Sequence, residues 1–159
     1  MDLKVLVRWL RAVIIGVGIC GLVAYGVVCP LCGLKIVEDH PDVSGWFVPW
    51  LVFILITAVP CYAVLVFCWK IVANIADGKA FSYENAKYFS VMSYLALGDI
   101  AFFFVGNVVL LLANMNHPAV ILASLIIVFV GIAVAVVFAT LSHLVRKAAD
   151  LQQENDLTV

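Results

Sequence analysis

The chain has 159 residues, of which 66% are hydrophobic and 12% are charged, and its formal net charge is −1. Soluble domains are about half apolar and about a quarter charged, and a chain of this length cannot hide so much apolar surface in a single aqueous core. The composition therefore excludes an ordinary soluble domain, and we expect a lipid bilayer to surround most of the protein.

Four apolar runs that are long enough to cross a bilayer follow one another, at residues 12–28, 49–69, 89–112 and 118–142. A helix of about 20 apolar residues spans the hydrocarbon core, and its backbone polar groups are satisfied internally. Alternating segments of about ten residues, which are typical of barrel strands, do not occur in the sequence. The pattern predicts an all-α fold: a four-helix transmembrane bundle at residues 1–142, followed by a tail at residues 143–159.

The positive charges predict how the spans are oriented, because lysine and arginine collect on the cytoplasmic side of membrane proteins. With four spans, eight of the nine basic residues fall on one side and only Lys35 falls on the other. We therefore expect the N-terminus, the connection between the second and third spans, and the C-terminus to be cytoplasmic. The eight residues are Lys4, Arg8, Arg11, Lys70, Lys79, Lys87, Arg146 and Lys147.

The first apolar run follows three basic residues, as the apolar part of a signal peptide does, but no small-residue cleavage site comes after it. We expect it to be an uncleaved span. Small residues recur at every fourth position in this run and in the last one, which favours close packing of helices in lipid and leaves open whether two bundles pair as a homodimer. The two stripes are Ala12, Gly16, Cys20 and Ala24, and Gly131, Ala135 and Ala139.

Two cysteines, in the segment Cys29-Pro-Leu-Cys32, stand at the outer end of the first span, and His40 and His117 fall in the outer loops. A disulfide between Cys29 and Cys32 suits an oxidising exterior. A metal site formed with the two histidines is an alternative, although one C-x-x-C supplies only two of the four ligands that zinc usually takes. A redox-active pair and two inert thiols remain open as well.

The second span and the turn after it carry local signals for bending, stopping and restarting a helix. Pro60 should bend the span because proline cannot donate a backbone hydrogen bond. The helix should continue past Trp69 and stop before Gly78, a residue that suits the left-handed conformation at a helix end. Ser82 suits the N-cap of the third helix, and Glu84 follows in the first turn, where the helix dipole favours negative charge.

The third span contains Asp99, which stands about 18 Å from Lys87 at about 1.5 Å per residue and therefore near the middle of the bilayer. An ionised aspartate there costs about 2.5–3.5 kcal/mol on insertion scales. We expect Asp99 to face the bundle interior near Asn107 and to bind a proton, an ion or a ligand. An interhelical hydrogen bond worth about 1 kcal/mol is the alternative. Candidate partners on other spans are Tyr25, Thr57, Tyr62 and Thr140.

A short connection before the fourth span predicts that the third and fourth helices are antiparallel neighbours, with Asn116 as N-cap and Pro118 in the first turn. After the span, apolar residues recur at helical spacing, and the tail then becomes acidic and ends in Leu157 and Val159, which alternate with polar residues as in an extended segment. DNA-binding proteins are basic because their target is phosphate, so an acidic tip suits such a protein as a partner. A frayed terminus is the alternative.

The segment Gly78-Lys-Ala-Phe-Ser-Tyr-Glu-Asn85 resembles the signature G-x-P-F-[ST]-x-E-N of a bacterial family of four-helix membrane proteins known only as domain of unknown function 2975, with Ala80 in place of the commoner proline. The ending Leu151-Gln-Gln-Glu-Asn-Asp-Leu-Thr-Val159 resembles the acidic C-terminus of that family, so the resemblance covers essentially the whole chain. Family members often look like partners of small helix-turn-helix regulators that are encoded beside them, which implies membrane-linked control of transcription. The partner-binding residues would be Gly78, Lys79, Phe81, Glu84, Asn85, Asp150, Glu154, Asp156, Leu157 and Val159.

The leading hypothesis is therefore a multi-pass membrane protein that binds a small cytoplasmic helix-turn-helix regulator and does not contact nucleic acid itself. One alternative is a small transporter or channel component that uses Asp99, and another is an outer-face redox or metal-sensing protein that uses Cys29 and Cys32. The sequence contains no catalytic triad, P-loop or complete metal motif, so we expect neither enzymatic activity nor a cofactor.

Overall fold

A computed structural model describes the backbone of residues 2–157 and the side chains of residues 2–155. In this part of the chain, four helical segments are long and apolar enough to cross a membrane, at Leu3–Asp39, Pro41–Ala76, Tyr83–Leu112 and Pro118–Asn155. No strand occurs among the described residues. The predicted all-α, four-span fold is confirmed.

The first segment is one helical rod that is longer than the predicted span of residues 12–28 at both ends. It consists of α1 (Leu3–Val23), a π-helical turn η1 (Ala24–Val28) and α2 (Cys29–Asp39). The basic N-terminal residues are therefore helical as well. A π-helical turn widens the helix locally and is frequent at functional sites, and this one carries Tyr25 in the middle of the segment.

The second segment ends and the third segment begins as the local signals predict. The 3₁₀-helix η2 (Pro41–Trp46) leads into α3 (Phe47–Ala76), which includes Pro60 and continues well past Trp69. Gly78 has a φ of +76°, the left-handed conformation expected of it. The helix α4 (Tyr83–Leu112) is capped by Ser82, whose Oγ accepts a hydrogen bond of 3.2 Å from the backbone N–H of Asn85.

The last helix, α5 (Pro118–Leu157), departs from the predictions at both ends. His117 and not Asn116 occupies the cap position, and its Nδ1 accepts a bond of 3.2 Å from the N–H of Ala119. The amide of Asn116 is buried and donates instead to Asn107 Oδ1 at 3.2 Å. The prediction of an extended segment at the C-terminus is wrong at Leu157, because α5 continues through that residue. Val159 lies outside the described residues.

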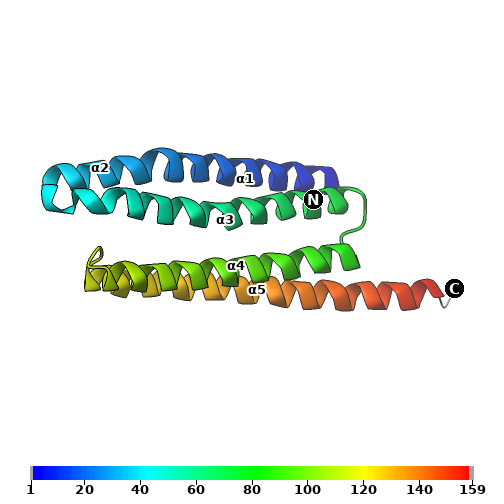
Figure 1. Cartoon of the computed structure of the whole chain (residues 1–159). Coiled ribbons are helices and arrows are strands. Elements are labelled where there is room, and N and C mark those ends of the chain that lie inside the picture. The colour runs from blue at the N-terminus through cyan, green and yellow to red at the C-terminus, as the bar shows by residue number, and fades with distance from the viewer. Residues whose placement is uncertain (1, 158–159) are drawn as a thin grey trace.

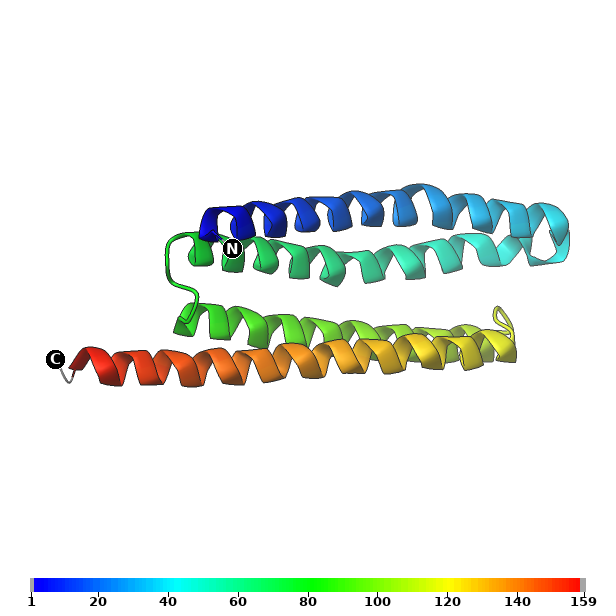
Figure 2. The same ribbon diagram turned by 180° about the vertical axis from the view of Figure 1, so that it is seen from behind.

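The helices form two antiparallel hairpins, one from the first and second segments and one from α4 and α5, and the hairpins meet where α3 packs on α4. The helix α1 contacts α3, α3 contacts α4, and α4 packs closely against α5 as its antiparallel neighbour, which confirms that prediction. Within the described residues, α1 makes no backbone-level contact with α4 or α5. Both views show this order of helices, with the N-terminus, the Gly78 turn and the C-terminus at one end (Figures 1 and 2). We call this end, which carries residues 2–11, 70–87 and 143–157, the basic end.

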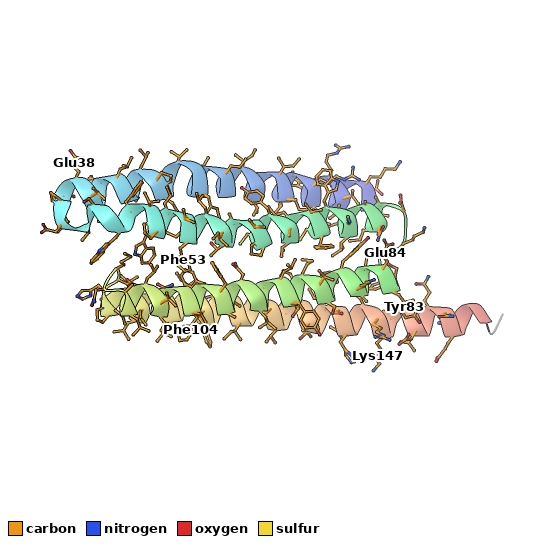
Figure 3. All side chains as sticks on the ribbon, in the orientation of Figure 1. Glu38, Phe53, Tyr83, Glu84, Phe104 and Lys147 are labelled. Carbon is orange, nitrogen blue, oxygen red and sulfur yellow. The ribbon has the colours of Figure 1, made fainter. Side chains whose placement is uncertain are left out.

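Aromatic contacts join the two hairpins. Phe53 on α3 is buried and points toward α4 (Figure 3), where its ring lies 5.4 Å from Phe102 and 5.8 Å from Phe103, measured between centroids. Nearer the basic end, the rings of Phe67 and Tyr88 lie 5.5 Å apart. Aromatic pairs at such distances are each worth about 0.5–1.5 kcal/mol beyond their burial. The joint between α3 and α4 is therefore an aromatic seam.

The two small-residue stripes have different surroundings. On α5, Ala135 is buried and its carbonyl accepts a bond of 2.8 Å from Ser93 Oγ on α4, while Gly131 lies against Ile100. The predicted close packing is therefore confirmed at Gly131 and Ala135, whereas Ala139 is exposed. The α1 stripe is exposed, and a Cβ added to Gly16 would meet no atom within 4 Å. Within the bundle, α1 instead contacts α3 through Gly18 and Gly21 on another face, and close packing of the α1 stripe against a second copy stays a prediction.

The aromatic seam can be tested with a pair of glycine variants. A Cβ on Gly106 would overlap the ring of Phe53, whereas Gly16 is in open space. We expect Gly106→Ala to lower the free energy of unfolding by about 1–3 kcal/mol through overpacking, and Gly16→Ala to leave it unchanged or raise it slightly, because alanine favours a helix. Thermal unfolding of the detergent-solubilised protein, followed by circular dichroism, measures both. Equal melting temperatures for the two variants would contradict the packing of α3 on α4.

Candidate functional site

Asn85 organises the turn at the basic end. Its side chain is 0% exposed, and its Nδ2 donates to the carbonyl of Lys79 at 3.1 Å and to that of Ala80 at 3.0 Å. Its Oδ1 accepts a bond of 2.8 Å from Asn74 Nδ2 on α3. The predicted partner-binding residue Asn85 therefore presents no surface to a partner, and it ties the turn to both neighbouring helices instead.

The other predicted residues of the turn are accessible. Gly78, Lys79 and Phe81 are exposed, and 59% of the Phe81 surface is exposed although its side chain is fully apolar. Glu84 is exposed too, and its carboxylate accepts bonds from Asn74 at 3.3 Å and from the Tyr88 hydroxyl at 2.5 Å. The turn therefore exposes an apolar side chain, Phe81, beside a carboxylate, Glu84, that is held by two hydrogen bonds.

Tyr83 connects this turn to the C-terminal helix. Its hydroxyl lies 2.6 Å from Asp150 Oδ1 and 3.1 Å from Gln153 Oε1. The hydrogen bond to the Asp150 carboxylate raises the pKa of Tyr83, which keeps the phenol protonated and able to donate. Figure 3 shows Tyr83 beside the part of α5 that runs past the start of α4, with Lys147 pointing away from the bundle. The sequence motif contains Tyr83, but we predicted no role for it.

We call the surface made by residues 78–84 and 143–155 the turn–tail face. It includes Asp150 and Glu154 on the exposed helix surface, together with the exposed apolar residues Leu144 and Leu151. Glu154 and the neighbouring Asn155 both interact with other groups. The side chains of Asp156 and Leu157, and the whole of Val159, lie outside the part of the chain that is described. The structure thus brings together the two stretches that the sequence predicts as one binding element.

A second candidate site lies within the membrane around Asp99. Its Oδ2 lies 3.8 Å from the thiol of Cys61 on α3, and its Oδ1 is buried without a hydrogen-bond partner. The hydroxyl of Tyr25 lies 3.9 Å from Cys61 Sγ and 3.4 Å from Thr57 Oγ1. Of the predicted partners, Tyr25 is thus linked to Asp99 by way of the Cys61 thiol, which lies between them. The sequence did not predict Cys61 as a partner, because an intramembrane cysteine gives no sequence signal of its own.

Asn107, which was predicted to lie close to the same helix face as Asp99, has a different environment. Asn107 is 1% exposed, donates to the carbonyl of Phe103 at 2.8 Å, and bonds Asn116 at the far end of α4. Thr140 on α5 donates to its own helix, at the carbonyl of Val136. Eight residues in a helix amount to about 80° of residual rotation at 3.6 residues per turn, which is enough to place Asn107 away from Asp99. The two polar groups therefore belong to different environments.

The end of the bundle opposite the basic end has a cavity of about 440 Å³. It is lined mainly by apolar and aromatic groups, including Trp46, Phe47 and Trp50, with Cys29, Cys32 and His117 among the remaining lining residues. The indole of Trp50 donates to the carbonyl of Met115 at 2.8 Å and so holds the α4–α5 connection beside α3.

The predicted disulfide does not form, because Cys29 and Cys32 are both free thiols. Both lie in α2 at positions i and i+3, where Cβ atoms are about 5–6 Å apart, whereas a disulfide needs about 3.5–4.5 Å. No group of three or more histidine, cysteine, aspartate or glutamate side chains that could hold a metal occurs among the described residues. The predicted set of Cys29, Cys32, His40 and His117 therefore does not assemble into a metal site.

The chain resembles proteins whose functions are not known. Residues 31–159 match a family described as "Protein of unknown function (DUF2975)". Over 151 residues the chain is 32% identical to the "Uncharacterized membrane protein YoaS" of Bacillus subtilis (strain 168), and the match covers 92% of each chain. No solved structure matches the chain. Together with the four apolar helices, the relative shows that this is a multi-pass membrane protein, and neither match indicates enzymatic activity.

Because Asn85 is buried, replacing it should lower the stability of the protein without changing the surface that a partner can reach. We expect Asn85→Ala to lower the free energy of unfolding by about 1–3 kcal/mol, because the carbonyls of Lys79 and Ala80 and the amide of Asn74 would lose their partner. Asn85→Asp should cost a similar amount, because a carboxylate cannot donate to carbonyls. Chemical unfolding in detergent measures both, with Lys87→Ala, at an exposed position in the first turns of the same helix α4, as the control. Wild-type stability of Asn85→Asp would show that the amide is not needed.

The free thiols at the opposite end can be counted directly. We expect Cys29 and Cys32 each to take one maleimide group in intact membranes without prior reduction, because both are at least partly exposed and unpaired. Mass spectrometry of the alkylated peptide makes the measurement. A peptide that takes up maleimide only after a reductant is added would instead support the disulfide.

Proposed function

The chain belongs to the DUF2975 family of membrane proteins, and we propose that it holds a small, basic helix-turn-helix regulator at the cytoplasmic membrane surface through the turn–tail face. In this proposal the basic end is cytoplasmic, as the distribution of lysine and arginine favours. Binding would keep the regulator away from DNA until a signal releases it.

The observation that supports the proposal best is the continuation of α5 beyond the membrane-spanning part of the bundle. Residues 143–157 form a helical extension of about 22 Å at about 1.5 Å per residue. A helix of this length that stands free in water is marginally stable. The single O–H of Tyr83, which lies within reach of both Asp150 and Gln153, holds this one against α4. This contact supports an ordered tail surface as far as Asn155.

The chemistry of the turn–tail face suits a basic protein partner. The acidic groups stand toward the tip of the helix, whereas Arg146 and Lys147 stand near the membrane, where they suit anionic lipid headgroups. The exposed apolar residues Phe81, Leu144 and Leu151 add area that a partner can bury. Interfaces typically combine apolar anchors with a polar rim in this way.

Truncation of the tail tests the proposal. We expect deletion of residues 150–159 to reduce capture of a small, basic helix-turn-helix protein by tenfold or more, because it removes the acidic tip and the acceptors of Tyr83. Tyr83→Phe should weaken capture several-fold by releasing the helix, and added salt should weaken capture by the wild type. Co-sedimentation of the purified regulator with nanodiscs that contain the chain measures the affinity.

The matched control is Asp42→Asn, which removes an exposed acid from the opposite end of the bundle and should leave capture unchanged. Circular dichroism of the truncated protein should show that the four spans still fold. Undiminished capture by a folded protein that lacks residues 150–159 would rule out the turn–tail face as the binding surface.

A further inference from the structure

A cavity of about 580 Å³ opens between the hairpins in the middle of the membrane, and we call it the membrane groove. Its walls come from α1, η1, α3, α4 and α5, so it is a feature of the whole assembly. Its volume falls within the range of about 300–1,000 Å³ that is typical of small-molecule sites. Among the residues that line it are Tyr25, Cys61, Tyr62, Asp99 and Val134.

Among the described residues, Asp99 is the one acid that lines this groove, and its hydrogen bonding is incomplete. One carboxyl oxygen has no partner, and the other has only a thiol at 3.8 Å, which is a weak donor. No lysine, arginine or histidine lines the groove within the described part of the chain. A carboxylate in lipid without a counter-charge is costly, so the groove lacks a cationic, hydrogen-bond-donating group at this position.

The walls indicate what such a group would be attached to. Apart from Asp99, the lining is apolar, aromatic or weakly polar. The hydroxyl of Tyr62 donates to the carbonyl of Gly18 at 2.9 Å, which fixes this ring at the groove wall. Aromatic rings also attract cations. The complement of this surface is an apolar body that carries one ammonium group.

We propose that the membrane groove binds a lipophilic amine in its ammonium form, with Asp99 as the counter-ion and Cys61 beside the bound nitrogen. A hydrated metal ion suits the groove less well, because hard cations take six or more oxygen ligands and Asp99 supplies the only carboxylate. This inference does not depend on the turn–tail face or on the regulator.

The arrangement of the helices also provides a route into the groove. In the described residues, α1 and α5 make no backbone-level contact although both line the groove. An amphiphile dissolved in the bilayer can therefore enter between them without passing through water. The π-helical turn at Ala24–Val28 places Tyr25 at the wall of this groove.

Protection of Cys61 from alkylation tests the proposal at the site itself. The probe is 4-phenylbutylamine, and the matched neutral compound is 4-phenylbutanol. In the full-length protein in a nonionic detergent, we expect a saturating amount of the amine to slow N-ethylmaleimide modification of Cys61 at least fivefold. The alcohol at the same concentration should slow it less than twofold. Cys68, which lies on the same helix but does not line the groove, is the internal reference and should react at an unchanged rate.

Two variants separate charge recognition from shape. Asp99→Asn should abolish protection by the amine. The rate at which N-ethylmaleimide modifies Cys61 in this variant without ligand is the baseline for that comparison. Val134→Phe should abolish protection by filling the groove while Asp99 is kept, and Val137→Phe on the lipid-facing side of the same helix should retain it. Equal protection by amine and alcohol, or protection that persists in Asp99→Asn, would overturn the proposal. So would a complete lack of protection in the wild type.

Discussion

The contact between α3 and α4 is the constraint on which the rest of the structure depends. The helix α1 rests on α3 and the helix α5 rests on α4, so the two hairpins meet mainly along the aromatic seam. Phe53 can approach α4 closely because Gly106 has no side chain. A bundle closed on all sides would bury the inner faces of α1 and α5 against each other, whereas this arrangement leaves a groove between them.

Both ends of the seam are fixed by polar contacts that are independent of the aromatic rings. At the basic end, Asn74 and Asn85 link α3 to α4 across the Gly78 turn. At the opposite end, the Trp50 indole holds the carbonyl of Met115. Because the groove and the turn–tail face both border this joint, a change in the angle between the hairpins would alter the width of the groove and the position of the turn together.

The sequence was sufficient for features that depend on local chemistry. Hydropathy located the spans, and the stop at Gly78 and the cap at Ser82 follow from the conformational preferences of single residues. It was insufficient where tertiary contacts decide. The burial of Asn85, the thiol of Cys61 beside Asp99 and the exposure of the α1 stripe all depend on which helix face meets which neighbour. The cap at His117 shows the same limit, because the side chain of Asn116 donates a hydrogen bond to the buried amide of Asn107 on α4 and does not cap α5.

The polar side chains within the spans show why Asp99 differs from the rest. The hydroxyls of Thr57, Ser124 and Thr140 donate to carbonyls of their own helices, and Ser93 donates to a carbonyl of α5. Such bonds satisfy a hydroxyl in lipid without any further group, because the donor hydrogen is used. An ionised carboxylate has no hydrogen to donate and can only accept. Beside Asp99, Oδ2 has the thiol of Cys61 at 3.8 Å, and Oδ1 has no hydrogen-bond partner. The fold thus satisfies these hydroxyls internally and leaves the acid to a group from outside the chain.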